Sequence, residues 1–350
     1  MTPPARAARS VARAGEAEAE AGERCGLVAL TGRANVGKST LLNSMVGLKV
    51  SIVSGRPQTT RAPVRAVLTR GAAQAVFVDT AGLHKPRTLL GQHLNRTALG
   101  AAEDADTIVA VVDARAGVGG GDRFVVERLP RLDILVVNKV DGLSHGQVLA
   151  QLEAVSGWGF EECFPVSAKT GAGVPELTQA LLDRLPEGPF LYPEGALRTG
   201  TEHGTAAEHG TAGQHGAGGQ LTGAGAQHTG APAGQHGLTG AHGSWAQRDM
   251  DEREWVAELV REQLLAIARE ELPYSIACQV TEWDWPFVRC EIWVERASQM
   301  GIVIGKGGSV LKRVGVAVRE QLPPGAYLEL SVKTEPRWQQ KPDALGRLGL

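Results

Sequence analysis

A glycine-rich loop with a lysine and two hydroxyls lies near the start of the chain. The stretch GRANVGKST, residues 32–40, fits the pattern G-x-x-x-x-G-K-[ST] between an apolar run and a helical pattern. Such a loop presents backbone N–H groups to phosphates at a helix N-terminus. We expect Lys38 to reach the β- and γ-phosphates of a nucleotide and Ser39 to ligate Mg²⁺. The residues predicted to bind here are Gly32, Asn35, Val36, Gly37, Lys38, Ser39 and Thr40.

A second phosphate element follows the apolar run AVFV. The stretch DTAG places Asp79 at the end of a predicted strand, near the expected magnesium ion, and Gly82 beside the γ-phosphate. Between the two elements, the segment SIVSGRPQTTRAP offers Thr59 and Thr60, and we favour Thr60 as a further magnesium ligand. The predicted catalytic residues are Lys38, Thr60, Asp79 and Gly82, and the predicted metal ligands are Ser39 and Thr60.

The residue after Gly82 raises a question about hydrolysis. In many GTPases this position holds a glutamine that orients the attacking water. Here it is Leu83, whose side chain can neither donate nor accept a hydrogen bond. Either the chain is not a GTPase, or it hydrolyses GTP without that glutamine.

Two further motifs predict which base is read. The stretch NKVD supplies Asn138, Lys139 and Asp141 after an apolar run, and the Asp141 carboxylate can accept both N1–H and N2–H of guanine. Adenine would leave that acceptor unpaired, which excludes it strongly. The stretch SAK supports the base with its three residues, Ser167, Ala168 and Lys169. Singly, NKVD could be a solvated turn and SAK a helix cap, but four elements in this order favour a guanine-nucleotide site.

A different glycine loop lies near the C-terminus. Gly305, Lys306, Gly307 and Gly308 form a G-x-x-G loop between two helical segments, as in KH domains that bind single-stranded nucleic acid. The surrounding segment 296–319 carries five cations and no acid, and apolar residues should wall the groove (Ile302, Val303, Ile304 and Val310). The predicted RNA-binding residues are Ile304, Gly305, Lys306, Gly307, Gly308, Lys312 and Arg313. The alternative is a structural glycine turn. The pair Trp283 and Trp285 could stack bases, although packing near a hairpin is favoured.

The order of apolar and amphipathic segments predicts the elements that position these motifs. From residue 25 to about 191, short Val/Ile/Leu-rich strands alternate with helical segments, which predicts a doubly wound α/β domain with ligands at the carboxyl ends of its strands. Residues 253–335 read as α-β-β-α-α-β, a small α+β domain of the type II KH kind. The predicted fold is therefore a mixed α/β P-loop GTPase sheet followed by a smaller KH domain.

Composition sets the domain boundaries. We predict a disordered tail over 1–24, a nucleotide-binding domain over 25–192, a Gly/His-rich linker over 193–247, a KH domain over 248–340 and a C-terminal tail over 341–350. The linker histidines could bind a transition metal, but their irregular spacing favours a polar spacer. The four scattered cysteines predict reduced thiols, no apolar run reaches about 20 residues, and the net charge of −2 requires any nucleic-acid site to be local. The Arg/Ala-rich start faintly resembles an organelle transit peptide.

With both halves in view, the chain resembles the Era family of bacterial ribosome-assembly GTPases with a C-terminal KH domain. The likeness rests on GRANVGKST, QTTR, DTAGLH, NKVD, VSAK, LPEGP, REELPYSI and VIGKGG, in that order. It implies slow hydrolysis without a catalytic glutamine, because family members carry a hydrophobic residue where Leu83 stands. It also implies Mg²⁺ and, in some relatives, K⁺ held partly by the loop asparagine, here Asn35; a loop-stabilising hydrogen bond is the alternative for Asn35.

The resemblance further implies partners. These are GTP and GDP, the 3′ end of small-subunit rRNA and the 30S subunit, in a cytoplasmic monomer; peripheral association with the inner face of the cell membrane is an alternative. Two loops depart from the family, since Ala34 and Ala81 stand where proline is common, and the 193–247 insertion casts doubt on the coupling of the domains. Rival functions are an RNA chaperone that binds nucleotide without cycling and a GTPase acting at a membrane or division site.

Overall fold

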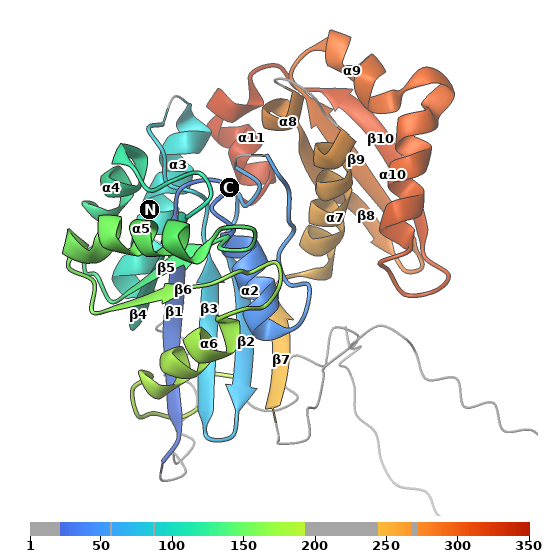
Figure 1. The fold of residues 1–350 in the computed structure, drawn as a ribbon. Helices are drawn as coiled ribbons and strands as arrows, with labels where there is room; N and C mark the ends of the chain where they lie inside the picture. Colours follow the sequence, from blue (N-terminus) through green and yellow to red (C-terminus); the bar gives the residue numbers. More distant parts are fainter. Residues whose placement is uncertain (1–21, 57, 87, 193–243, 268–271) are drawn as a thin grey trace, which may run out of the picture.

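The computed structural model describes residues 22–350 except 57, 87, 193–243 and 268–271 (Figure 1). Its first unit is a seven-stranded sheet in the order β6-β5-β4-β1-β3-β2-β7. The five strands from β6 to β3 run parallel, whereas β2 is antiparallel to β3, and β7 is antiparallel to β2. The strands are β1 (Arg24–Gly32), β2 (Val64–Arg70), β3 (Ala73–Asp79), β4 (Thr107–Asp113), β5 (Ile134–Asn138), β6 (Glu162–Pro165) and β7 (Ser244–Asp249).

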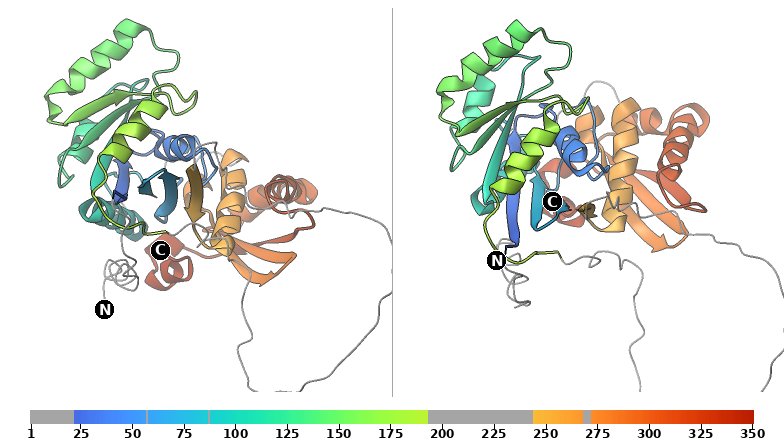
Figure 2. Two further views of the ribbon diagram at one scale, coloured as in Figure 1. Left: turned by 90° about the horizontal axis from the view of Figure 1, so that it is seen from below. Right: turned by 60° about the horizontal axis from the view of Figure 1, so that its bottom comes forward.

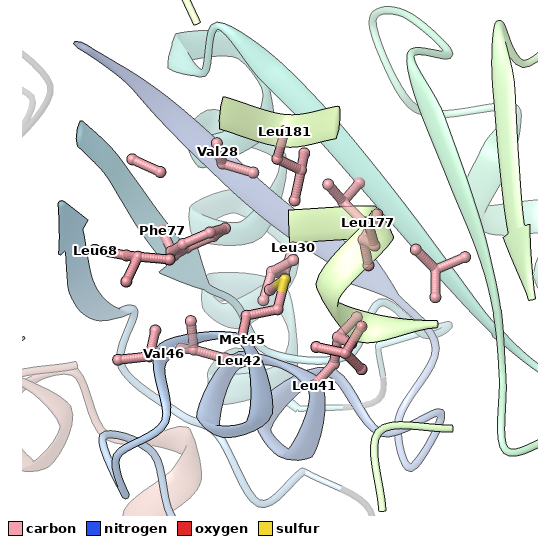
Figure 3. Close-up of a cluster of buried hydrophobic side chains, with 14 of the residues drawn as sticks. Val28, Leu30, Leu41, Leu42, Met45, Val46, Leu68, Phe77, Leu177 and Leu181 are labelled. Atoms are coloured by element: carbon pink, nitrogen blue, oxygen red, sulfur yellow. The ribbon is translucent and has the colours of Figure 1, made fainter. Parts of the chain in front are cut away.

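Helices cover both faces of this sheet, as the predicted doubly wound domain requires. Alternate residues of the central strands face opposite ways: Val109 and Val111 pack with α2 and α6, while Ala110 and Val112 pack in the cluster that contains Val155 of α5. Figure 3 shows the first of these cores, built around Phe77 and the leucines of α2 and α6. The helices are α2 (Lys38–Val46), α3 (Leu89–Asp104), α4 (Gly120–Val126), α5 (His145–Val155) and α6 (Val174–Asp183).

The second unit is a three-stranded sheet in the order β10-β9-β8, with β9 antiparallel to β8 and parallel to β10. Its α-β-β-α-α-β order is the one predicted for the KH domain, with two short helices added. The elements are α7 (Glu252–Ile267), α8 (Leu272–Ser275), β8 (Ala277–Asp284), β9 (Phe287–Val294), α9 (Ala297–Ile304), α10 (Ser309–Arg319), β10 (Tyr327–Thr334) and α11 (Pro342–Arg347). No helix in the described part of the chain is long and apolar enough to cross a membrane.

Three predicted boundaries were wrong. Residues 244–247, assigned to the linker, and 248–249, assigned to the KH domain, belong to β7, because the backbone groups on the outer edge of β2 pair with β7 in an antiparallel register. Residues 341–350, assigned to a tail, contain α11, which begins with a proline at its first position and buries Ala344 and Leu345 against the KH domain. Arg24, assigned to the N-terminal tail, is the first residue of β1 and pairs with Ala73 of β3. Residues 1–21 of that tail and the linker histidines lie outside the described residues.

The two units pack closely on each other (Figure 2). Ile52, from the loop after α2, is buried in the same apolar cluster as α7 residues of the KH domain. A second shared cluster joins Ala81 and the helix α3 to Trp338 and α11. The loops predicted to respond to nucleotide therefore form part of the domain interface.

Candidate nucleotide and nucleic-acid sites

The phosphate loop lies between the end of β1 at Gly32 and the start of α2 at Lys38. A Cβ atom on Gly37 would lie 2.4 Å from Nδ2 of Asn138, so the loop can pack against the base-reading strand only with glycine there. The loop borders a cleft of ≈ 340 Å³. The cleft is lined by Ala34, Asn35, Gly37, Lys38, Ser39, Thr40, Ile52, Val53, Ser54, Gly55, Gln58, Thr59, Thr60, Gly82 and Lys139.

Lys38 is buried and held by the loop itself. Its Nζ donates to the carbonyl oxygens of Gly32 at 3.3 Å and Arg33 at 3.0 Å. Burial lowers the pKa of Lys38 to about 8, and the neighbouring Asp79 carboxylate opposes that shift. The ammonium is thus placed beside the cleft, where phosphate oxygens would restore its charged form.

The predicted metal ligands gather around Asp79. Ser39 Oγ donates to Asp79 Oδ2 at 2.6 Å and lies 3.1 Å from Thr60 Oγ1, while Ser51 Oγ donates to the same carboxylate oxygen at 2.9 Å. Among the described residues, Asp79 Oδ1 is buried without a hydrogen-bond partner, and burial raises the pKa of this carboxyl. Hydroxyl and carboxylate oxygens are the ligands that Mg²⁺ takes, so the group fits this cation. Thr59 instead donates to the carbonyl of Arg56 at 2.7 Å.

The segment after β3 answers the question about Leu83. A Cβ on Gly82 would lie 2.4 Å from the backbone nitrogen of Ala34, so Gly82 packs directly on the phosphate loop. The backbone N–H of Leu83 donates to Gly32 O at 3.0 Å, but its side chain is 2% exposed and packs with Ala98 and Val125. Leu83 is therefore a core residue whose side chain does not lie in the cleft.

The residues predicted to read the base come together at the ends of β5 and β6. Asn138 Nδ2 donates to Val36 O at 2.9 Å, and Asn138 Oδ1 accepts from Ala168 N at 3.0 Å, so this asparagine joins the phosphate loop to SAK. Lys139 Nζ donates to Asn35 O at 2.5 Å and to Asp113 Oδ2 at 2.6 Å. Lys169 is exposed beside them.

Asp141 has two polar partners. Ser167 Oγ donates to Asp141 Oδ1 at 2.7 Å and is the main cause of the lowered pKa of this carboxyl, with Arg115 adding to it. Arg115 Nη2 donates to Asp141 Oδ2 at 2.9 Å. Sequence reasoning missed Arg115, because it lies 26 residues before Asp141 in no recognised motif. The carboxylate is thereby kept ionised and oriented as an acceptor.

The G-x-x-G loop turns the chain from α9 into α10. Gly305, Gly307 and Gly308 all have positive φ, and the space around Gly307 and Gly308 is open. The three predicted cations, Lys306, Lys312 and Arg313, are exposed. A shallow hollow of ≈ 400 Å³ on α10 is lined by Ser309, Lys312, Arg313, Val316, Ala317 and Glu320. The loop and this cationic helix face can receive a nucleic-acid backbone.

Of the predicted groove walls, one is wrong. Val303 is 2% exposed and packs in the KH core. Its neighbour Ile302 is 59% exposed, and Ile304 is half-buried. The period of a helix explains the difference, because adjacent residues point about 100° apart and cannot share a face.

The loop 49–61, which carries Thr60, is held by the KH helix α7. Glu262 Oε1 accepts from Val53 N at 2.9 Å, and Glu262 Oε2 accepts from Lys49 Nζ at 2.5 Å. Buried Arg261 donates to the Thr59 carbonyl. Arg61 Nη1 donates to Ile276 O, just before β8, at 2.6 Å. The position of Thr60 is thus tied to the KH domain through both of its sequence neighbours.

Comparison with known proteins agrees with these sites. Residues 27–139 match the family described as 50S ribosome-binding GTPase, and residues 271–339 match the KH domain. GTPase Era of Mycobacterium sp. strain KMS is 38% identical over 344 residues, covering 93% of this chain and 98% of the relative. The chain belongs to the GTPase Era family. Era of Heliobacterium modesticaldum is 35% identical over 339 residues, with 93% and 97% covered.

Solved Era structures show the same architecture. A variant of Aquifex aeolicus Era bound to GDP.AlF4⁻ superposes with a TM-score of 0.75 at 30% identity, covering 93% of this chain and 99% of the other. An Era complex with MgGDPNP and nucleotides 1506–1542 of 16S ribosomal RNA gives the same values. The protein is therefore an Era-type GTPase with a KH domain, which contradicts the rival reading of a chaperone that does not cycle.

Proposed function

We propose that this GTPase is a switch that binds the single-stranded 3′ end of small-subunit rRNA and acts in maturation of the 30S subunit. The observation that carries the proposal is the set of hydrogen bonds from α7 to the loop of Thr60, because an element of the KH domain then contacts the nucleotide site directly. A related Era was solved with both MgGDPNP and 16S rRNA nucleotides, which supports the choice of RNA. Coupling between two ligands is reciprocal, so RNA should also tighten GTP binding.

The chain's own groups account for nucleotide binding. The loop N–H groups and Lys38 would hold the phosphates, Ser39 and Thr60 would hold Mg²⁺ near Asp79, and Asp141 would accept from guanine. Bound Mg²⁺ neutralises charge on the β- and γ-phosphates. Since Leu83 is buried, no side chain at that position orients the attacking water, which favours slow hydrolysis suited to a timed switch.

The proposal extends to K⁺ at Asn35. Asn35 lines the cleft, and in this structure its Nδ2 donates to Gly55 O at 2.9 Å. This bond uses the amide nitrogen, so the amide oxygen Oδ1 could serve a monovalent cation, which would supply positive charge near the phosphates. Hydrolysis should then be faster in KCl than in NaCl at equal ionic strength, and Asn35→Ala should remove the difference. Equal rates for the unaltered protein in the two salts would refute the K⁺ role.

We further propose that the protein is a cytoplasmic monomer, since its scattered cysteines and its rRNA partner fit that compartment. Sedimentation of the purified chain should give the mass of one copy, and fractionation should recover it with ribosomal subunits. Recovery on membranes in a form released by salt would instead establish peripheral association.

The switch is tested by titrating a labelled oligonucleotide matching the 3′ end of small-subunit rRNA. The protein is loaded with GDP or with a non-hydrolysable GTP analogue. Tighter binding with the analogue, lost when Gly307 and Gly308 are both changed to Asp, is the expected result, because carboxylates there would repel the phosphates. Equal affinity in both nucleotide states would refute the switch while leaving the two binding sites in place.

A further inference from the structure

The three-stranded sheet of the KH domain has one face turned away from α9 and α10. Side chains alternate along β9, so Val288, Cys290 and Ile292 enter the core on the helical side. Phe287, Arg289, Glu291 and Trp293 lie on the opposite side, which we call the open face. The register places β10 residues Tyr327 and Glu329 and the β8 residue Glu282 on the same face.

One end of the open face is covered by the chain's own C-terminal segment. Trp293 is 1% exposed and packs with Ala344 and Leu345 of α11. The guanidinium of Arg347 lies 4.8 Å from the Trp293 ring centroid, and Gln279 Nε2 donates to Arg347 O at 2.7 Å. This half shows what the face accepts: small apolar side chains, with a guanidinium over an aromatic ring.

The other end repeats these features, and none of the described residues covers it to the same extent. Tyr327 is 60% exposed and stacks on Phe287, with centroids 5.4 Å apart and planes at 16°. Trp285, at the adjacent β8–β9 turn, is 43% exposed. Exposed aromatic rings grouped at one place mark an interaction surface more often than single exposed ones do.

The charges around the rings select the partner. Arg289 pairs with Glu282 at 2.6 Å and with Glu329 at 3.1 Å, so two carboxylates share one guanidinium. Asp284, opposite Phe287 in the register, is exposed and adds a further negative charge. This end is therefore net negative, which repels nucleic-acid phosphates and attracts cations.

We propose that the aromatic end of the open face docks an arginine-rich, extended segment of a protein partner. Guanidinium groups would stack on Tyr327 and pair with Glu282 and Glu329, as Arg347 does on Trp293 at the covered end. The G-x-x-G loop lies between α9 and α10 on the helical side. A protein segment and single-stranded RNA could thus bind the KH domain at the same time.

The test uses a fluorescein-labelled peptide of six alternating Arg-Ala pairs, with a Glu-Ala peptide as its negative control, titrated by anisotropy into the full chain at about 0.15 M salt. Tyr327→Ala and Glu329→Lys should each weaken binding about tenfold. The matched controls are Leu149→Ala and Glu153→Lys on α5, which remove an exposed apolar side chain and reverse a charge far from this face. Both controls should bind as the unaltered protein does.

Two outcomes would overturn the proposal. Equal weakening by the face variants and their controls would show that the peptide senses only overall charge. Loss of single-strand RNA affinity in Tyr327→Ala, with peptide affinity unchanged, would show that the rings stack bases instead. Because Tyr327 is largely exposed, its truncation leaves the core intact, and the Glu329→Lys variant gives an independent reading.

Discussion

The phenol hydroxyl of Tyr192 donates a 2.6 Å hydrogen bond to the Asp249 carboxylate, 57 residues further along the chain. Tyr192 stands just before the insertion, and Asp249 ends the strand β7 that follows it. Only Met250 and Asp251 separate β7 from the KH helix α7. Both ends of the insertion are thus fixed to the nucleotide-binding sheet, and the connection between the domains is short.

This arrangement predicts that the insertion does not weaken coupling. Replacing residues 195–243 with a ten-residue Gly-Ser segment, which reaches about 17 Å, should keep β7 in place. The ratio of RNA affinities with GTP analogue and with GDP should stay within about twofold of the full chain, because the contacts of α7 are unchanged. A ratio that falls to one would show that the insertion itself carries the coupling.

Tyr192→Phe, which removes one charge-assisted hydrogen bond, should cost about 1–2 kcal/mol of stability.

Leu83→Gln should not create a faster GTPase. The side chain at this position is 2% exposed and packed against Ala98 and Val125, so a glutamine would bury an amide without partners. We expect about 2–4 kcal/mol of destabilisation, seen as a lower Tm, with no rise in kcat. Leu83→Met, of similar volume, should cost under about 1.5 kcal/mol. A faster variant with an unchanged Tm would place this side chain in the cleft instead.

Nucleotide affinity should fall as the pH rises through about 8. Burial lowers the pKa of Lys38 to about 8, whereas bound phosphates favour the charged ammonium, so binding above that pH requires proton uptake. At pH 8.5 about three quarters of free-site lysines are neutral, and GDP affinity should be about fourfold lower than at pH 7. Calorimetry in two buffers of different ionisation enthalpy should show about 0.8 protons taken up at pH 8.5 and about 0.1 at pH 7. Zero uptake at pH 8.5 would contradict the assignment.

Sequence motifs predicted the site residues that lie within one short segment. Contacts between residues far apart in the sequence were missed. The phosphate loop, DTAG, NKVD and SAK could be read because each sits at a strand end, and parallel strands bring those ends together. The contact of Arg115 with Asp141 could not be predicted, because the two residues are 26 positions apart and no sequence motif links them. The hydrogen bond from Val53 N to Glu262 joins residues 209 positions apart in the sequence. Such contacts depend on how domains pack, which periodicity does not report.

Removing the contacts between Glu262 of α7 and the loop that carries Thr60 should weaken GTP-analogue binding more than GDP binding. Glu262 accepts from Val53 N and Lys49 Nζ, and the same loop carries Thr60 to the cluster around Asp79. The proposed ligand role of Thr60 applies only when the γ-phosphate is present, so freeing the loop should weaken mainly the GTP state. Glu262→Ala should lower Mg²⁺-dependent affinity for the analogue about tenfold and change GDP affinity less than about twofold.

Glu252→Ala is the matched control for this prediction. Glu252 is an exposed glutamate in the first turn of the same helix, nearly three turns from Glu262, so its loss should leave both affinities unchanged. Labelled-nucleotide titrations of the two variants decide the matter. If Glu262→Ala lowers GDP and analogue affinities equally, the contact supports the fold of the loop in general, and α7 has no part in distinguishing the nucleotide states. If only the analogue is affected, the KH domain helps to place Thr60, and RNA binding at that domain has a direct route to the nucleotide.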